Sequence, residues 1–119
     1  MKSELAAVSA GGVLGALARF HISAAWPGIW AVWTINVSGS FLIGVLMVLI
    51  ARRWPEQRLL RPFLGVGVLG GYTTFSAAMV DVTQATPAMA LACLFGTATA
   101  ALLAVWAGTA LTSALVPAR

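Results

Sequence analysis

Charged residues are scarce in this sequence. Its 119 residues include three acidic side chains and seven lysines and arginines, and charged residues make up 8% of the total. Soluble domains usually carry about 25% charged residues, so this chain has too few to cover a soluble globular surface. Since 61% of the residues are hydrophobic, the composition excludes a soluble multidomain enzyme and predicts an integral membrane protein of one domain.

Several kinds of site are also missing. The one cysteine, Cys93, has no disulfide partner and is expected to fill space as a small apolar side chain. His21 has no His, Cys or carboxylate at metal-ligand spacing. No nucleophile–base pair, glycine-rich phosphate loop or carboxylate pair occurs, so we do not expect an enzyme. The net charge is +4, but the positively charged residues lie between apolar runs and form no basic stripe. Their distribution argues against a nucleic-acid partner.

Four apolar runs remain, and each is long enough to cross a membrane. A spanning helix needs about 20 apolar residues, and such runs cover approximately residues 5–23, 29–51, 62–84 and 88–115. Tryptophans near the ends of these runs are typical of the membrane–water interface. The predicted fold class is therefore all-α: a single domain of four transmembrane helices, residues 1–119, surrounded by lipid.

The positive charges are distributed unevenly over the two sides of the membrane. With four spans, the N-terminus, the second loop and the C-terminus share one side, which carries Lys2, Arg52, Arg53, Arg58, Arg61 and Arg119. The opposite side has Arg19, near the end of the first span. Because loops rich in Lys and Arg remain in the cytoplasm, we predict cytoplasmic N- and C-termini and a single orientation.

Small residues recur at four-residue spacing, which lets helix backbones approach closely in lipid. The pairs are Gly11 and Gly15, Gly67 and Gly71, and Ser40 and Gly44. Tight packing is the simplest interpretation of these pairs. A four-span chain of this length has little interior of its own, so we expect any pathway to require an oligomer.

The middle of the third span is unsuited to a continuous helix. Residues 65–76 read GVGVLGGYTTFS, and adjacent glycines followed by Thr73 and Thr74 weaken a helix. In lipid, non-helical backbone persists where protein buries it or where it lines a water-filled cavity, and its free carbonyls and amides are ion ligands. The run indicates either an ion site at a break, or a packing notch at Gly70 and Gly71 with hydroxyls bonded back to the helix.

Neutral hydrogen-bond donors accompany this run. Asn36 lies in the second span, where an amide is costly unless it is paired or hydrated. It forms either a bond between helices or, with Thr73, Thr74 and Ser76, a donor-lined path for a small anion. The ring edge of Phe75 would add a weak positive contact to such a path.

Two charged residues near the span ends also have two interpretations. Asp81 is either an interfacial carboxylate or part of a permeation path. Arg19 either extends its side chain to the interface or attracts anions into a vestibule.

Three segments of the chain carry a resemblance. Residues 11–19 read GGVLGALAR, residues 34–44 read TINVSGSFLIG and residues 70–76 read GGYTTFS. They are similar to the segments GGxxGAxxR, VNxxGxxxxG and GGxTTFS of the CrcB/Fluc family of bacterial fluoride channels. Their order and spacing along the chain agree with those of the family.

The resemblance implies an antiparallel dimer in the bacterial inner membrane, with a broken third helix, that exports toxic fluoride passively and excludes chloride through two pores along the subunit interface. It also implies a structural Na⁺ at the dimer centre, held by main-chain carbonyls that correspond here to Gly70 and Thr73. The candidates for the fluoride path are Asn36, Phe75, Ser76, Thr74, Ser40, Thr97 and Thr99. The candidates for the vestibule are Arg19 and Asp81, the latter where the family usually has glutamate.

The sequence departs from the family pattern directly after the third segment. The usual continuation TTFSTFSxE is replaced by residues 73–81, TTFSAAMVD, so Ala77 and Ala78 stand where the family has threonine and a second phenylalanine. This predicts damage to one of the two pores. A homodimer of oppositely inserted subunits also needs nearly even charges, so the uneven charge favours a heterodimer with an oppositely oriented homologue over a homodimer.

Two other functions compete with a fluoride channel. A small multidrug-resistance exporter also has four spans, but it needs a membrane carboxylate in the first helix, and the acid there, Glu4, lies outside the apolar run. A non-conducting or regulatory membrane subunit gains some support from Ala77 and Ala78.

Overall fold

The computed structural model describes residues 1–117, so Arg119, which contributes to the predicted orientation, lies outside the described residues. Four helices are long and apolar enough to cross a membrane, as predicted. Their elements are α1 (Lys2–Ala25), α2 (Ile29–Arg53), the π-helix η1 (Arg61–Leu69), α3 (Gly70–Tyr72), α4 (Phe75–Gln84) and α5 (Pro87–Leu115). The third span thus consists of η1, α3 and α4.

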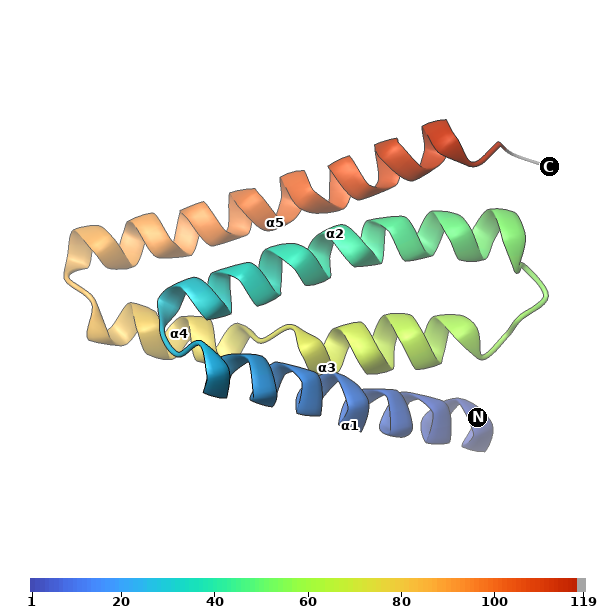
Figure 1. Cartoon of the computed structure of the whole chain (residues 1–119), viewed down its shortest axis with the longest axis horizontal. Coiled ribbons are helices and arrows are strands. Elements are labelled where there is room, and N and C mark those ends of the chain that lie inside the picture. The colour runs from blue at the N-terminus through green and yellow to red at the C-terminus, as the bar shows by residue number, and fades with distance from the viewer. Residues whose placement is uncertain (118–119) are drawn as a thin grey trace.

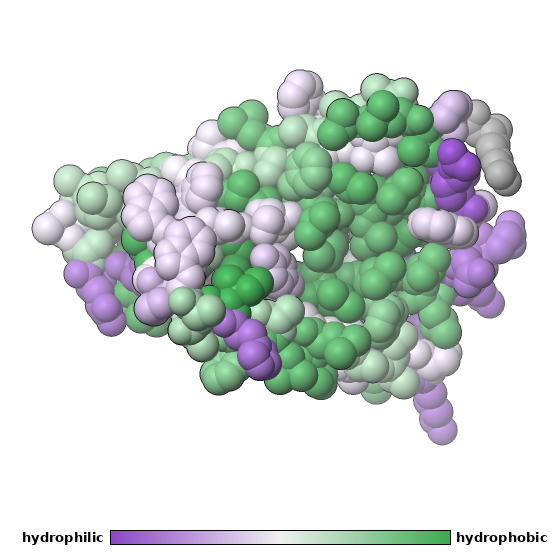
Figure 2. All heavy atoms as spheres, viewed as in Figure 1, coloured by the Kyte–Doolittle hydropathy of each residue, from purple (hydrophilic) through white to green (hydrophobic). Residues whose placement is uncertain are grey.

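The spans lie alongside one another, with α1 and α5 outermost and α2 and the third span between them (Figure 1). The N-terminus, the α2–η1 loop and the end of α5 lie together at one end. The longest dimension of the molecule is 49 Å, which exceeds the hydrocarbon core of about 30 Å. Hydrophilic residues gather at the end with the termini, and a hydrophobic middle separates them from the other end (Figure 2). The chain is a multi-pass membrane protein.

The chain buries very little hydrophobic surface. Within residues 1–117 the buried hydrophobic side chains are Ala31 and Ile35, whereas Phe20, Phe95 and Trp106 are about two-thirds exposed. Helices that are apolar on all sides are typical of membrane spans, because lipid solvates their outer faces. The interior of the single chain is therefore small, and much of its apolar surface is available to lipid or to another chain.

Glycines bring α1 into backbone contact with the third span. A Cβ atom at Gly11 would collide with the carbonyl oxygen of Phe63, and one at Gly15 with that of Val68. In the other direction, a Cβ atom at Gly71 would collide with the carbonyl oxygen of Gly12. Close approach of this kind is what small residues permit in lipid, so these glycines are packing positions.

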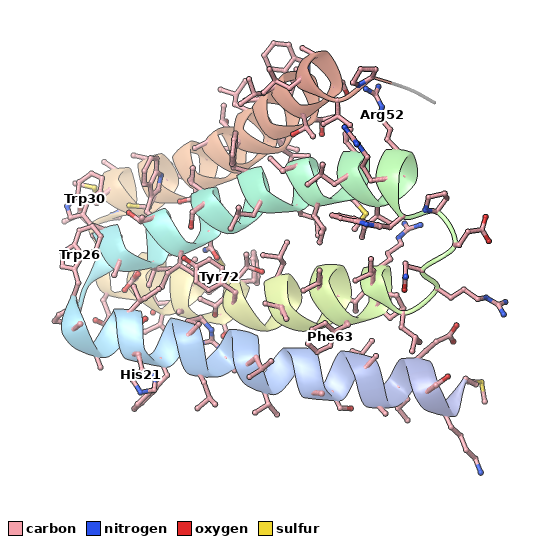
Figure 3. All side chains as sticks on the ribbon, turned by 45° about the vertical axis from the view of Figure 1, so that its right-hand side comes forward. His21, Trp26, Trp30, Arg52, Phe63 and Tyr72 are labelled. Carbon is pink, nitrogen blue, oxygen red and sulfur yellow. The ribbon has the colours of Figure 1, made fainter. Side chains whose placement is uncertain are left out.

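A second close contact joins α2 to α5. Gly44 lies against the backbone of Val105, and Gly108 lies against the carbonyl of Phe41. At the end with the termini, Arg52 donates hydrogen bonds to the carbonyls of Ser113, at 2.8 Å, and Val116. Figure 3 shows Arg52 between the ends of α2 and α5. A cationic side chain at a helix C-terminus satisfies free carbonyls and interacts favourably with the helix dipole.

The third span changes its neighbours along its length. Its first part, η1 and α3, packs mainly on α1, whereas α4 packs on α5 and α2. The change takes place across Thr73 and Thr74, between the end of α3 and the start of α4. This point of the fold positions the candidate site.

Candidate functional site

Two extended threonines separate α3 from α4. Thr73 has φ −75° and ψ 155°, and Thr74 has φ −146° and ψ 118°. Each hydroxyl satisfies one helix end: Thr73 Oγ1 donates to the carbonyl of Leu69 at 3.0 Å, and Thr74 Oγ1 accepts from the N–H of Ala77 at 3.2 Å. The Thr74 contact is the usual side-chain cap at a helix N-terminus. The Thr73 hydroxyl bonds back to the helix, one of the two arrangements that the sequence allowed.

Asn36 of α2 pairs with both main-chain polar groups of Thr74. Its Oδ1 accepts the N–H of Thr74 at 2.8 Å, and its Nδ2 donates to the carbonyl of Thr74 at 2.9 Å. Both residues are buried. Unpaired main-chain groups are costly in an apolar medium. Pairing by Asn36 therefore stabilises the extended conformation of Thr74. An amide nitrogen carries two hydrogens, and the second N–H has no hydrogen-bond partner within residues 1–117.

A further polar contact joins α2 to the end of α3. The Oγ of Ser38 lies 3.0 Å from the hydroxyl of Tyr72 and donates to the carbonyl of Ile35 at 3.2 Å, so the Tyr72 hydroxyl is the donor to Ser38. A Cβ atom at Gly39 would collide with the Thr73 side chain and would lie 3.2 Å from the Tyr72 ring. The contacts from Asn36 to Gly39 therefore hold one turn of α2 directly against the interruption.

Arg19 reaches the interruption from the opposite side. Its Nε donates to the carbonyl of Gly71 at 3.1 Å, and the side chain is half-buried. In a continuous α-helix this carbonyl would accept the N–H of residue 75. Arg19 of α1 and Asn36 of α2 thus pair two main-chain groups that the interruption leaves without helical partners, the carbonyl of Gly71 and the N–H of Thr74.

Next to the interruption, α2, α4 and α5 enclose an open cleft of about 650 Å³. The sequence-predicted residues that line it are Asn36, Ser40, Thr73, Thr74, Phe75, Asp81 and Thr97. Its other described lining residues are mostly apolar, and Asp81 is the charged one among them. One oxygen of Asp81, Oδ2, is buried and has no hydrogen-bond partner in the described part of the chain.

Four predicted residues lie outside this cleft. Ser76 is exposed, with its Oγ 3.3 Å from Thr74 Oγ1, and Thr99 is exposed on α5. Gly70 is also exposed, and Arg19 lies on the α1 side of the interruption. Conversely, Cys93 lines the cleft although the sequence predicted a simple space-filling role. The available signal was its position four residues before Thr97, because residues four apart share one face of a helix.

Comparison with known proteins identifies the family. A family model described as "CrcB-like protein, Camphor Resistance (CrcB)" matches residues 6–109. The chain belongs to the CrcB family. The match covers most of α1, all of α2 and the third span, and most of α5.

Curated relatives of this CrcB-family chain are named as fluoride channels. It is 48% identical over 114 residues to the fluoride-specific ion channel FluC 2 of Nocardia farcinica, covering 88% of this chain and 81% of the relative. It is 50% identical over 121 residues to FluC 2 of Thermobifida fusca, covering 94% and 90%. It is 47% identical over 108 residues to FluC 1 of Rhodococcus jostii, covering 91% and 84%.

Proposed function

We propose that this CrcB-family chain is a subunit of a fluoride-selective channel that lets fluoride leave the cell down its gradient. The observation that carries the proposal is the amide of Asn36, which pairs with Thr74 and retains one N–H beside a cleft whose other polar groups are largely neutral. The names of the relatives support the same function. A passive channel needs no nucleophile, nucleotide site or proton-coupling carboxylate in the first helix.

Recognition of fluoride would rest on neutral donors. An ion that leaves water needs its lost hydration replaced by protein groups. The remaining N–H of Asn36 and the hydroxyls of Ser40 and Thr97 are available along the cleft. The ring of Phe75 is 74% exposed and can present its positive edge to an anion. We place Asp81 at a vestibule, outside the narrow part of the path.

A second subunit would close the cleft. The cleft is open in the single chain, and the subunit has a very small interior of its own. We propose an antiparallel dimer with the path along the interface. The cytoplasmic side would carry the N-terminus, the α2–η1 loop and the C-terminus, and the charge bias favours an oppositely oriented homologue as the partner. Ala78 lines the cleft in place of a second aromatic ring, so we expect one of the two pores to be impaired.

The interruption also presents oxygen ligands for a cation. In a continuous helix the carbonyl of Gly70 would accept the N–H of Thr74, and that of Thr73 would accept the N–H of Ala77. These two N–H groups bond instead to Asn36 Oδ1 and Thr74 Oγ1. Free carbonyls of unwound membrane helices suit Na⁺. We propose that the carbonyls of Gly70 and Thr73 hold a structural Na⁺ at the dimer centre.

Fluoride efflux from liposomes tests the proposed function. We expect fluoride release without chloride release, either from the chain alone or from the chain combined with an oppositely oriented homologue, measured with ion-selective electrodes. Changing Phe75→Ile should abolish the flux, because it removes the exposed ring of the cleft while retaining an apolar side chain. Silence from folded protein in both combinations would contradict the channel and favour a non-conducting subunit.

A matched variant controls for the loss of an aromatic ring. Phe95 is 65% exposed on α5 and lies outside the cleft lining. Phe95→Ile should therefore leave fluoride flux unchanged, while both variants assemble normally in detergent. Equal flux in the two variants would remove Phe75 from the path.

The orientation of the subunit is separately testable. A reporter tag at either terminus should appear only on the cytoplasmic side, because the positive charges at that end oppose translocation. The assay is accessibility of the tag to a membrane-impermeant label in whole cells and in lysed cells. Comparable labelling on both sides would contradict the single orientation and favour the homodimer.

A further inference from the structure

One face of α1 follows the third span residue by residue. Gly11, Gly15 and Arg19 recur at four-residue spacing and therefore share one side of the helix. The two glycines are buried against the backbone of the third span, at Phe63 and Val68. One turn later the helical part of that span ends at Tyr72, and the next residue of the α1 face is the long side chain of Arg19.

Arg19 meets a specific need at that position. The carbonyl of Gly71 has lost the helical partner that residue 75 would provide, because Thr73 and Thr74 are extended. A free carbonyl in the membrane is costly, and the end of a helix carries partial negative charge. The Nε of Arg19 donates to this carbonyl at 3.1 Å, and Arg19 does not line the cleft.

We infer that Arg19 is a positioning residue: it caps the end of α3 through the Gly71 carbonyl and so holds Thr73 and Thr74 extended. This role replaces that of an anion-attracting charge in a vestibule. The cap also occupies the Gly71 oxygen, so the oxygens left for a cation are those of neighbouring residues. Only the flux readout of the test rests on the proposed channel function.

Two substitutions separate the hydrogen bond from the charge. In arginine the chain from Cα runs through three carbons to Nε, and in glutamine it runs through three carbons to Nε2. Arg19→Gln therefore keeps an N–H donor at the same distance along the side chain and removes the charge. Arg19→Lys keeps the charge but places a methylene group where Nε stands. Arg19→Met removes both, and Arg58→Gln in the exposed α2–η1 loop controls for loss of a positive charge.

Hydrogen–deuterium exchange of the peptide covering residues 70–77, in the assembled protein in detergent, measures the cap without any flux. Arg19→Gln and Arg58→Gln should exchange like the unmodified protein. Arg19→Met and Arg19→Lys should exchange about tenfold faster, because a carbonyl left without its donor in an apolar medium costs about 1–3 kcal/mol. Wild-type exchange in Arg19→Met, or fast exchange in Arg19→Gln, would overturn the inference.

Fluoride efflux then compares the two roles of Arg19. We expect Arg19→Gln to retain flux within about threefold of the unmodified protein, a change below the free energy of one hydrogen bond, and Arg19→Met to lose it. Retained flux in Arg19→Lys together with lost flux in Arg19→Gln would overturn the inference in favour of a vestibule charge. Absence of flux in the unmodified protein would contradict the proposed function, while the exchange experiment would still decide the role of Arg19.

Discussion

Gly15→Ala should prevent the subunit from folding stably. The added Cβ atom would collide with the carbonyl oxygen of Val68 and would lie 2.7 Å from the main-chain nitrogen of Tyr72. Both obstacles are backbone atoms, which cannot turn aside as a flexible side chain can. Overpacking typically costs about 1–3 kcal/mol and occasionally more, and we expect the upper end here. The measurement is the yield of monodisperse protein in detergent and its thermal unfolding temperature.

The same helix supplies a matched control. A Cβ atom at Gly12 would meet no described atom within 4 Å. Gly12→Ala should therefore be neutral or stabilise the protein by up to about 1 kcal/mol, because alanine favours a helix more than glycine does. If the two variants had similar unfolding temperatures, the backbone contact between α1 and the third span would be wrong.

Asn36→Asp should lower fluoride flux by at least about tenfold, because a buried group left without its partner costs about 1–3 kcal/mol and a charged group more. The carboxylate can still accept the N–H of Thr74. However, it replaces the Nδ2 donor with an oxygen that faces the Thr74 carbonyl, which now lies 2.9 Å from that donor. It also puts a negative charge beside the proposed path of an anion. Efflux from liposomes measures the result.

Ser38→Ala is the control for a neighbouring polar residue of α2. It removes the contact with the Tyr72 hydroxyl and leaves the pairing of Asn36 with Thr74 intact. We expect flux within about threefold of the unmodified protein, since a neutral hydrogen bond contributes about 1 kcal/mol. Full flux in Asn36→Asp would remove Asn36 from both the path and the support of the interruption.

The helices were accessible to prediction because their signal is local. The first span was predicted over residues 5–23, and α1 runs from Lys2 to Ala25; hydropathy finds the apolar part of a helix but not its polar ends. The sequence predicts a weak point in the third span at Gly70 and Gly71 followed by Thr73 and Thr74. In the structure a π-helix precedes Gly70, and the extended residues are the two threonines and not the glycines. The helical propensity of glycine alone does not locate the point where the chain leaves the helix.

The candidate site was predictable as a set of residues but not as an arrangement. The polar pattern selected Asn36 and Thr74, yet they are 38 residues apart, and the sequence left open whether the amide bonds another helix or an ion. Within residues 1–117 the amide has a main-chain partner and keeps one N–H unpaired, so the same side chain can both bond another helix and contact an ion. Thr97 and Thr99 looked equivalent in the sequence, but Thr97 lines the cleft and Thr99 is exposed, because residues two apart point to different sides of a helix.

The sequence by itself determined that this chain lies in a membrane, that it has four spans and that it belongs to the CrcB family. Composition, hydropathy and motif order suffice for these conclusions, because each depends on residues that are close in the chain. Only the tertiary structure decided which main-chain groups at the interruption are paired: Asn36 pairs with those of Thr74 from one side, and Arg19 donates to the carbonyl of Gly71 from the other. These pairings depend on which helix faces lie against each other, and backbone contacts at Gly15, Gly39 and Gly71 set those faces.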